Sequence, residues 1–184
     1  MDAPSTASLV TDAAPVLLLE AAVAGDDEAF RRLVEPYLEA ALRASILVTG
    51  SEAEASDAVQ DALLAAWQTL AKLREPQAFG GWFRTIVVRS AMRHARSRPR
   101  IVALDLAAAT PAGALDRSLE GRELARAFAT LSPEDRLALT LRHLWGVSTG
   151  EAARLLGIPD GTVKSRTFHA LERLRAAYAA EERR

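Results

Sequence analysis

The chain has 184 residues, of which 49% are hydrophobic, and its formal net charge is −1, so it is not a uniformly basic nucleic-acid-binding protein. Its length fits one large domain or two small helical ones, and the lack of cysteine excludes disulfides and thiolate metal sites. The charges are segregated: residues 51–61 carry four acids and no base, and residues 84–100 carry six arginines and no acid. This segregation indicates separate surfaces for separate partners.

The N-terminal residues 1–14 are rich in Ala, Ser, Thr, Pro and Asp, a composition that predicts disorder. No basic residue precedes Arg31, so the positively charged start of a signal peptide is missing. The apolar stretch that follows residue 14 is too short to span a bilayer and is interrupted by Glu20. We therefore expect a soluble cytoplasmic protein without membrane insertion.

A first helical unit is expected over residues 15–98. Within it, apolar residues at three-to-four spacing predict a first helix over residues 26–48. Pro36 lies inside this pattern and should kink or split the helix, and Gly50 should end it.

Two more helices complete this unit. Ser51 and Glu54 form a capping box at the start of the second helix, whose apolar stripe runs to Leu70. A break at Pro76 precedes a third helix, which begins with several aromatic residues and runs into the arginine-rich segment.

Residues 99–119 show no sustained periodicity, and we interpret them as a flexible linker. A second unit is expected over residues 120–184. In it, Ser132 and Pro133 are typical of an N-cap and a first helical position, and Gly146 should end that helix. The predicted fold is therefore all-α, with two small helical domains joined by a linker.

The strongest local pattern covers residues 148–175. Ser148 should cap a short helix that Gly157 ends, and Asp160 should cap a longer helix that runs to about Ala180. A short helix, a glycine-containing turn and a longer second helix are typical of a helix-turn-helix, whose second helix enters the major groove of DNA. The alternative is a plain helical hairpin with a charged surface.

The second helix of this motif has two predicted faces. The outward face carries Lys164, Ser165 and Phe168, which suit contacts with base edges and with a thymine methyl group. The inward face is apolar and consists of Val163, Thr167, Ala170, Leu171 and Leu174.

Two groups of residues suit phosphate contacts. In the helix-turn-helix they are Arg166 and His169, beside a helix N-terminus near Thr162. In the arginine-rich segment, three-to-four spacing predicts a basic stripe of Arg89, Arg93, Arg96 and Arg100. Trp82 and Phe83 lie just upstream of this stripe, an arrangement that suits single-stranded DNA. For Phe83 and Trp82 we favour core packing over a contact with DNA, and a solvated helix end is the alternative for the arginines.

An enzyme is the least favoured class. The three histidines, His94, His143 and His169, have no metal-ligand spacing, and the sequence contains no glycine-rich phosphate loop and no nucleophile–base pair. We therefore expect no catalytic residues, no metal and no cofactor. A stand-alone helix-turn-helix regulator, whose first unit senses a ligand or dimerises and which binds a palindromic duplex, is one class that the pattern leaves open.

Longer stretches carry a family resemblance. The segments SDAVQDALLAAWQTLAKL and AFGGWFRTIVVRSAMRHAR resemble region 2 of sigma-70 family sigma factors of the extracytoplasmic-function class. The segment from LSPEDRLALT to GTVKSRTFHALERLR resembles their region 4, and GTVKSR is its most specific part. Order and spacing agree over roughly residues 20–178.

This resemblance implies a promoter-specificity subunit of RNA polymerase. Region 2 of the family contacts the clamp helices of the largest polymerase subunit, and region 4 docks on the flap of the second. The matching polymerase-binding residues are Asp57, Gln60, Asp61, Leu64 and Trp67. Family members are commonly held by an anti-sigma factor, which makes such a protein a candidate partner.

The resemblance also implies how promoter DNA is read. Region 4 reads the −35 element in duplex DNA, and the matching residues are Thr162, Lys164, Ser165, Arg166, Phe168 and His169. Region 2 melts and reads the −10 element, and the matching residues are Arg74, Phe79, Trp82, Arg84, Thr85, Val88, Arg89, Arg93, His94 and Arg96. The chain departs from the family at Arg89 and Arg93, where Asn and Asp are common, and this bears on the −10 base preference.

Overall fold

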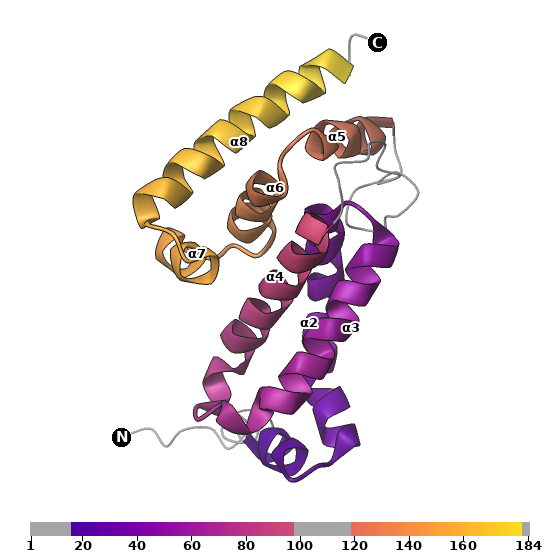
Figure 1. The fold of residues 1–184 in the computed structure, drawn as a ribbon, viewed down its shortest axis with the longest axis vertical. Helices are drawn as coiled ribbons and strands as arrows, with labels where there is room; N and C mark the ends of the chain where they lie inside the picture. Colours follow the sequence, from indigo (N-terminus) through magenta and orange to yellow (C-terminus); the bar gives the residue numbers. More distant parts are fainter. Residues whose placement is uncertain (1–15, 98–118, 182–184) are drawn as a thin grey trace, which may run out of the picture.

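The computed structural model describes residues 16–97 and 119–181, which we call the N-terminal unit and the C-terminal unit (Figure 1). Across these two ranges the chain forms helices joined by turns and no strand, which confirms the all-α prediction. After a helix at residues 16–23 come α2 (Asp27–Thr49), α3 (Glu52–Thr69), α4 (Phe79–Ser97), α5 (Leu119–Ala129), α6 (Pro133–Leu139), α7 (Thr149–Leu156) and α8 (Asp160–Glu181). The predicted disordered segment and nearly all of the predicted linker lie outside the described residues.

Short irregular helices connect the longer ones. They are η1 (Leu70–Lys72), η2 (Pro76–Ala78) and the π-helical η3 (Thr140–Leu144). The first two form the turn that the sequence predicts around Pro76 between the second and third helices. The third extends α6 towards the helix-turn-helix, and Gly146 follows it in the left-handed conformation with φ +61°.

The first helices follow the predicted pattern with two differences. The helix at residues 16–23 was not predicted; it buries Leu19 and Ala22 in the core of the N-terminal unit. Of the two expected effects of Pro36, a kink or a split, the split was wrong, because α2 runs through it without interruption. Proline has no N–H, so the carbonyl one turn earlier in the helix loses its usual donor. Because Pro36 is exposed, water can take the place of that donor.

Local capping explains where the helices begin. Asp26 accepts hydrogen bonds from the backbone N–H groups of Glu28 and Ala29 at 2.9 and 3.0 Å, and Ser51 accepts one from Glu54 at 3.4 Å. Side-chain oxygens at these positions satisfy donors that a helix start would otherwise leave unpaired. The Ser51 half of the predicted capping box is therefore confirmed, while the backbone N–H of Ser51 donates to Thr49 Oγ1 at 3.3 Å.

Helices α2, α3 and α4 pack against each other to form the N-terminal unit (Figure 1). Four alanines of α3 are fully buried and allow close helix approach: Ala55, Ala58, Ala62 and Ala66. At the start of α4, the rings of Phe79 and Phe83 stack with centroids 5.9 Å apart, and Tyr37 of α2 packs on both. This aromatic cluster fixes the N-terminal end of α4.

The C-terminal unit shows the predicted caps with one correction. Ser132 and Ser148 each accept a backbone hydrogen bond at 3.1 Å, and Gly157 ends α7 at φ +67°. However, α8 already includes Asp160, and the carbonyl of Pro159 accepts from the next turn. The prediction that Asp160 caps this helix was therefore wrong by one position; its carboxylate lies in the first turn, which suits the positive end of the helix dipole.

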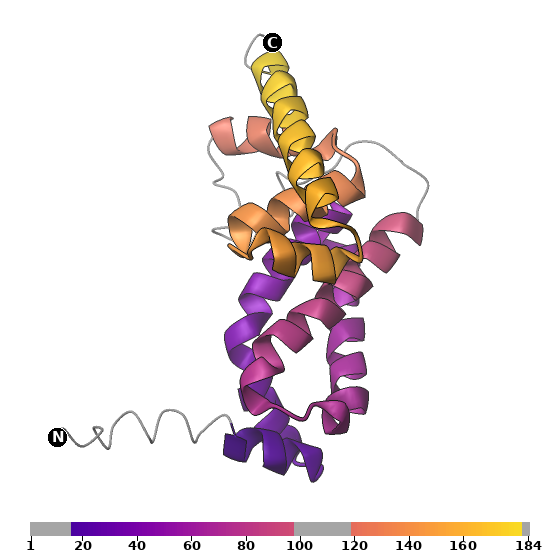
Figure 2. The same ribbon diagram turned by 90° about the vertical axis from the view of Figure 1, so that its left-hand side faces the viewer.

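The two units lie against each other, with the C-terminal unit over one end of the N-terminal bundle in both views (Figures 1 and 2). A single buried cluster contains Val48 and Val88 from the first unit and Leu137 and Val163 from the second. Among the described residues, no helix is long and apolar enough to cross a membrane.

Candidate nucleic-acid and protein interfaces

Helices α7 and α8 form the helix-turn-helix that the sequence predicts. Ala152 of α7 and Val163 of α8 are fully buried where the two helices meet, so small and branched side chains set their close approach. Arg142 donates to the carbonyl of Val147 and braces the turn that leads into α7. The second helix of the motif, α8, is thus fixed in place by packing against other helices of the C-terminal unit.

The outward face of α8 matches the prediction. Phe168 is 61% exposed, and its ring meets the His169 ring edge-on with centroids 5.4 Å apart. Lys164 and Ser165 are also exposed, and the Ser165 hydroxyl donates to the carbonyl of Thr162 at 3.2 Å. Exposure of a large aromatic ring to water is unfavourable. A row of Lys, Ser and Phe at the surface is therefore typical of a site that binds a partner.

The inward face is also as predicted. Val163 and Ala170 are fully buried, and Leu171 and Leu174 pack on the cluster of Phe128 and Leu131. The two faces of α8 are therefore separated as the periodicity requires.

Several arginines of α4 form ion pairs with acids of other helices. Arg84 lies 3.6 Å from Glu151 of α7, and Arg96 lies 3.0 Å from Glu134 of α6. Arg89 is exposed and forms no ion pair within the described ranges. Three members of the predicted basic stripe, Arg89, Arg93 and Arg96, therefore lie on α4, and Arg100 lies outside the described residues. Arg96 and the neighbouring Arg84 contact the C-terminal unit.

Not every residue of the predicted −10 set lies at the surface. Phe79 and Val88 are buried, and Trp82 is half-buried against Phe79 with ring centroids 5.7 Å apart. Arg74 is exposed, and the hydroxyl of Thr85 donates to the carbonyl of Gly81 at 2.9 Å. Phe79 and Val88 thus occupy supporting positions in this arrangement, and Arg74 and Trp82 reach solvent.

The face of α3 opposite the core carries the predicted protein-binding residues. Asp57, Gln60 and Leu64 are exposed, and Leu64 is a large apolar side chain at the surface. Trp67 is half-buried, and its ring meets Phe30 edge-on at 5.0 Å. This acidic face with one exposed leucine suits a basic protein surface that has an apolar pocket.

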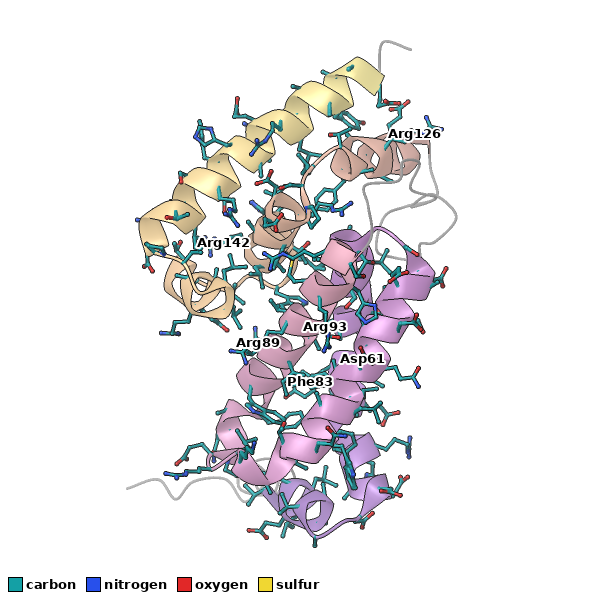
Figure 3. The ribbon with its side chains drawn as sticks, viewed as in Figure 1. Asp61, Phe83, Arg89, Arg93, Arg126 and Arg142 are labelled. Atoms are coloured by element: carbon teal, nitrogen blue, oxygen red, sulfur yellow. The ribbon has the colours of Figure 1, made fainter. Side chains whose placement is uncertain are left out.

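The acidic face of α3 and the basic face of α4 meet at His94. Its Nε2 lies 3.0 Å from Asp61 Oδ2, and its Nδ1 lies 3.2 Å from Glu54 Oε2. Arg93 adds a second cation 3.6 Å from Asp61, and Figure 3 shows these two residues side by side. The hydrogen bond to Asp61 raises the pKa of His94; burial opposes this, and Glu54 adds to it.

A groove of about 1090 Å³ is lined by residues of α4 and of the C-terminal unit. It brings together residues of both predicted DNA-binding sets, namely Val88, Arg89, Arg93, Arg96, Thr162, Ser165, Arg166 and His169. Arg154 and Arg173, which the sequence analysis did not single out as contacts, line it as well. In the sequence these two arginines could be recognised only as basic residues of the last two helices, with no indication that they face α4.

Two carboxylates reduce the positive charge of this groove. Asp135 pairs with Arg173 at 3.0 Å, and Glu134 pairs with Arg96. Burial acts to raise the pKa of Glu134, but a backbone hydrogen bond at the helix start and Arg96 lower it below its usual value. Glu134 therefore stays ionised while it holds the end of α4.

Comparison with known protein families gives two matches that follow the two units. Residues 33–101 match "Sigma-70 region 2", and residues 121–174 match "Sigma-70, region 4". The first match covers the acidic helix α3 and the basic helix α4, and the second covers the helix-turn-helix of α7 and α8.

Individual relatives cover nearly the whole chain. The sequence is 32% identical over 163 residues to the ECF RNA polymerase sigma factor SigM of Mycobacterium tuberculosis, covering 85% of this chain and 81% of the relative. It is 33% identical over 171 residues to SigL of the same species, covering 84% and 91%. It is 32% identical over 174 residues to the ECF RNA polymerase sigma-E factor of Escherichia coli, covering 85% and 90%.

Solved structures resemble the fold. CnrH, solved in complex with the cytosolic domain of CnrY, aligns with a TM-score of 0.65 and 27% identity over 91% of this chain and 98% of CnrH. The sigma factor RpoE of Bartonella quintana, solved with the anti-sigma factor NepR, aligns with a TM-score of 0.65 and 26% identity over 80% and 95%. Both alignments extend across the N-terminal and C-terminal units.

Proposed function

Because the chain belongs to the extracytoplasmic-function class of sigma-70 family sigma factors, we propose that its two units read the two promoter elements while core RNA polymerase holds them apart. It is a promoter-specificity subunit of RNA polymerase. A stand-alone regulator is not favoured, because residues 33–101 match sigma region 2 and not a sensing domain.

The −35 element is read by α8. The observation that carries this assignment is the exposed row of Lys164, Ser165 and Phe168 on a helix whose opposite face is buried. Lys and Ser can bond base edges in the major groove, and Phe can contact a thymine methyl group. Arg166 and His169 flank this row and suit phosphate contacts.

The −10 element is read by α4 and the turn before it. The contact set consists of Arg74, Trp82, Arg84, Thr85, Arg89, Arg93, His94 and Arg96, all of which reach the surface at least in part. A melted strand needs cations for its phosphates and a ring on which a base can stack, and this set supplies both. Phe79 and Val88 position these side chains from beneath.

The largest polymerase subunit binds the acidic face of α3. Asp57, Gln60 and Leu64 are exposed for direct contact, whereas Asp61 and Trp67 are half-buried and support them. An acidic surface also explains how a DNA-binding protein reaches a net charge of −1, since its charges serve two partners of opposite sign. The C-terminal unit docks on the flap of the second polymerase subunit.

An anti-sigma factor is the further partner that we propose, because the Bartonella RpoE was solved with the anti-sigma factor NepR bound and CnrH was solved with the cytosolic domain of CnrY. In this assignment the protein works in the cytoplasm and has no catalytic activity of its own. It contributes binding energy and promoter choice, and the polymerase contributes the chemistry.

Run-off transcription tests this function. Purified protein is mixed with core RNA polymerase and a library of promoter fragments, and the transcripts are sequenced. Specific transcripts that require both the protein and core would support the assignment. Tight binding of a palindromic duplex in the absence of core, with no transcripts in its presence, would refute it in favour of a stand-alone regulator.

A further inference from the structure

Four charged side chains form a network inside the N-terminal unit: Glu54 and Asp61 of α3, and Arg93 and His94 of α4. Figure 3 shows Arg93 on the side of α4 that faces Asp61. We propose that the two acids are positioning residues for the −10 element, and that they hold Arg93 and His94 in place for the DNA strand. This inference rests on the proposed function, since it takes α4 as the helix that reads the −10 element.

The spacing of the two acids places both on the side of α3 that faces α4. Glu54 and Asp61 are separated by about two helical turns, so their side chains project in nearly the same direction. Ala58 lies between them and is fully buried in a cluster with Ala91 and Met92 of α4. A methyl group at this position lets the two helices approach closely, and the carboxylates therefore reach α4 on either side of it.

His94 is held at both nitrogens of its ring. Its Nε2 lies 3.0 Å from Asp61 Oδ2, its Nδ1 lies 3.2 Å from Glu54 Oε2, and its side chain is only 19% exposed. Neither nitrogen can donate to a base or a phosphate without breaking a contact with α3. What His94 brings to the DNA strand is therefore its charge.

Arg93 is oriented through one nitrogen of its guanidinium group. Its Nη2 lies 3.6 Å from Asp61 Oδ2 and donates to the hydroxyl of the buried Ser90 at 3.1 Å. The side chain as a whole is 65% exposed, so the group lies at the surface. Because arginine has five N–H donors, a guanidinium held in this way can still donate to a phosphate.

The net charge of the network depends on His94. When the ring is protonated, the two acids and the two bases balance. When the ring is neutral, one negative charge is left beside the arginine that meets a polyanion. Among the described residues, Glu54 and Asp61 are the charged groups that act on His94, and both favour its protonated form.

The network separates the roles of two neighbouring acids of α3. Asp57 is exposed and forms no ion pair with any described residue, which suits direct contact with polymerase. Asp61 lies one turn further along, and its Oδ2 is shared by His94 and Arg93 of the same chain. In this inference Asp57 meets polymerase, and Asp61 serves α4.

Asp61→Asn tests the positioning role, because the amide keeps the size of the side chain and removes its charge. Removal of a negative charge should by itself strengthen the binding of DNA, whereas loss of positioning should weaken it. The two explanations therefore predict opposite signs. Asp61→Glu keeps the carboxylate and is the conservative variant. Glu52→Gln is the matched control, since Glu52 is an exposed acid of the same helix and lies outside the network.

Binding is measured on holoenzyme assembled from each variant and core RNA polymerase. The probe is a fluorescent single-stranded −10 oligonucleotide, taken from a promoter that run-off transcription by the wild type identifies. We expect Asp61→Asn to weaken binding of this probe roughly fivefold, and Asp61→Glu and Glu52→Gln to stay within about twofold of the wild type. The affinity of all four proteins for core should agree within about twofold.

A double-mutant cycle with Arg93→Ala distinguishes positioning from a loss of stability. Arg93→Ala should weaken probe binding roughly tenfold in the wild type and less than about twofold in the Asp61→Asn background, because a guanidinium that is not oriented contributes little. A general folding defect would instead lower the affinity of both backgrounds and leave the cost of Arg93→Ala unchanged.

The pH profile of probe binding gives a second measurement that a merely structural role would not change. The affinity of the wild type should fall as pH rises from 6 to 8, because His94 loses its proton and the network gains a net negative charge. His94→Gln cannot take up a proton, and its profile should be flatter over this range. The exposed His143 and His169 are present in both proteins, so the difference belongs to His94.

Tighter probe binding by Asp61→Asn, or an equal cost of Arg93→Ala in both backgrounds, would overturn the positioning role. Weaker core binding by Asp61→Asn with unchanged probe binding would also overturn it, and would place Asp61 in the polymerase interface. Identical pH profiles of the wild type and His94→Gln would overturn the role of the His94 charge. Absence of run-off transcripts from the wild type itself would instead refute the proposed function.

Discussion

His94 Nε2 lies 3.0 Å from Asp61 Oδ2 while the other nitrogen of the same ring lies 3.2 Å from Glu54 Oε2. A neutral imidazole has one N–H and can donate to only one of these carboxylates, whereas the protonated ring donates to both. The bridge therefore favours the charged form, in line with the raised pKa of His94. It also joins the face of α3 that we assign to polymerase with the helix that we assign to the −10 element.

This bridge predicts a pH dependence of stability. Because the pKa of His94 is raised in the folded protein, its stabilising effect is fully present below the unfolded value of about 6.5 and is lost as pH rises through the folded value. Urea unfolding of the wild type should give a larger free energy of unfolding at pH 6 than at pH 8. His94→Ala should lose about 1–2 kcal/mol at pH 6 and much less at pH 8.

The other two histidines serve as an internal control for this prediction. His143 and His169 are exposed, so His169→Ala should keep the pH dependence of the wild type. A His94→Ala variant that retains the full difference between pH 6 and pH 8 would assign the effect to another group.

A second prediction concerns two adjacent glycines at the start of α4. A Cβ at Gly80 would lie 3.0 Å from Tyr37 Cε1 and 3.2 Å from its hydroxyl oxygen, whereas a Cβ at Gly81 would meet nothing within 4 Å. Alanine favours a helix over glycine by up to about 1 kcal/mol. We expect Gly81→Ala to raise the free energy of unfolding and Gly80→Ala to lower it by about 1–2 kcal/mol, because the Tyr37 ring must move.

Urea unfolding of the two single variants measures this difference directly. The pair is well matched, since both glycines lie in the first turn of one helix and receive the same methyl group. Equal stabilisation by the two substitutions would mean that the Tyr37 ring gives way at no cost.

The sequence predicted the features that depend on neighbouring residues and missed those that depend on distant ones. Ser51, Ser132 and Ser148 cap helices as expected, because a cap needs only the next three residues. The burial of Phe79 and Val88 was not predicted, since it depends on Tyr37 and on the C-terminal unit, which are remote in the chain. Contact between the two units likewise leaves only an indirect signal, the run of apolar residues at the end of α2.

The faces of α8 illustrate the same point. Helical periodicity alone separated the buried face from the exposed one, and Phe168 lies on the exposed face as expected. Periodicity could not show that Arg166 and His169 share a groove with Arg89 of α4, because that depends on how the units pack.

A third prediction tests the acidic face of α3. Asp57 is exposed and forms no ion pair with any described residue, so its charge can be reversed without breaking an intramolecular contact. Asp61 is unsuitable for this test because it pairs with His94 and Arg93. Asp57→Lys should weaken binding to core RNA polymerase roughly tenfold, and unfolding by urea should be unchanged within about 0.5 kcal/mol.

Glu20→Lys is the control for this charge reversal, since Glu20 is exposed on the helix at residues 16–23. Fluorescence anisotropy of labelled protein titrated with core polymerase gives the two dissociation constants. Equal affinities for Asp57→Lys and Glu20→Lys would remove α3 from the proposed polymerase interface.

The last prediction concerns the exposed row on α8. Lys164 and Phe168 lie on the face opposite the buried Val163 and Ala170, so truncating either leaves the core of the C-terminal unit intact. Lys164→Ala and Phe168→Ala should each cost roughly 1–3 kcal/mol of discrimination between the correct −35 sequence and a mutated one. The chain has one other lysine, Lys72, which is exposed in η1, and Lys72→Ala is therefore the matched control.

Run-off transcription from paired templates measures the discrimination, while binding to core polymerase is followed in parallel. If Lys164→Ala and Phe168→Ala reduced transcription from both templates equally, the row would contribute to general DNA affinity and not to sequence reading, because a base contact must distinguish the two templates and a phosphate contact cannot.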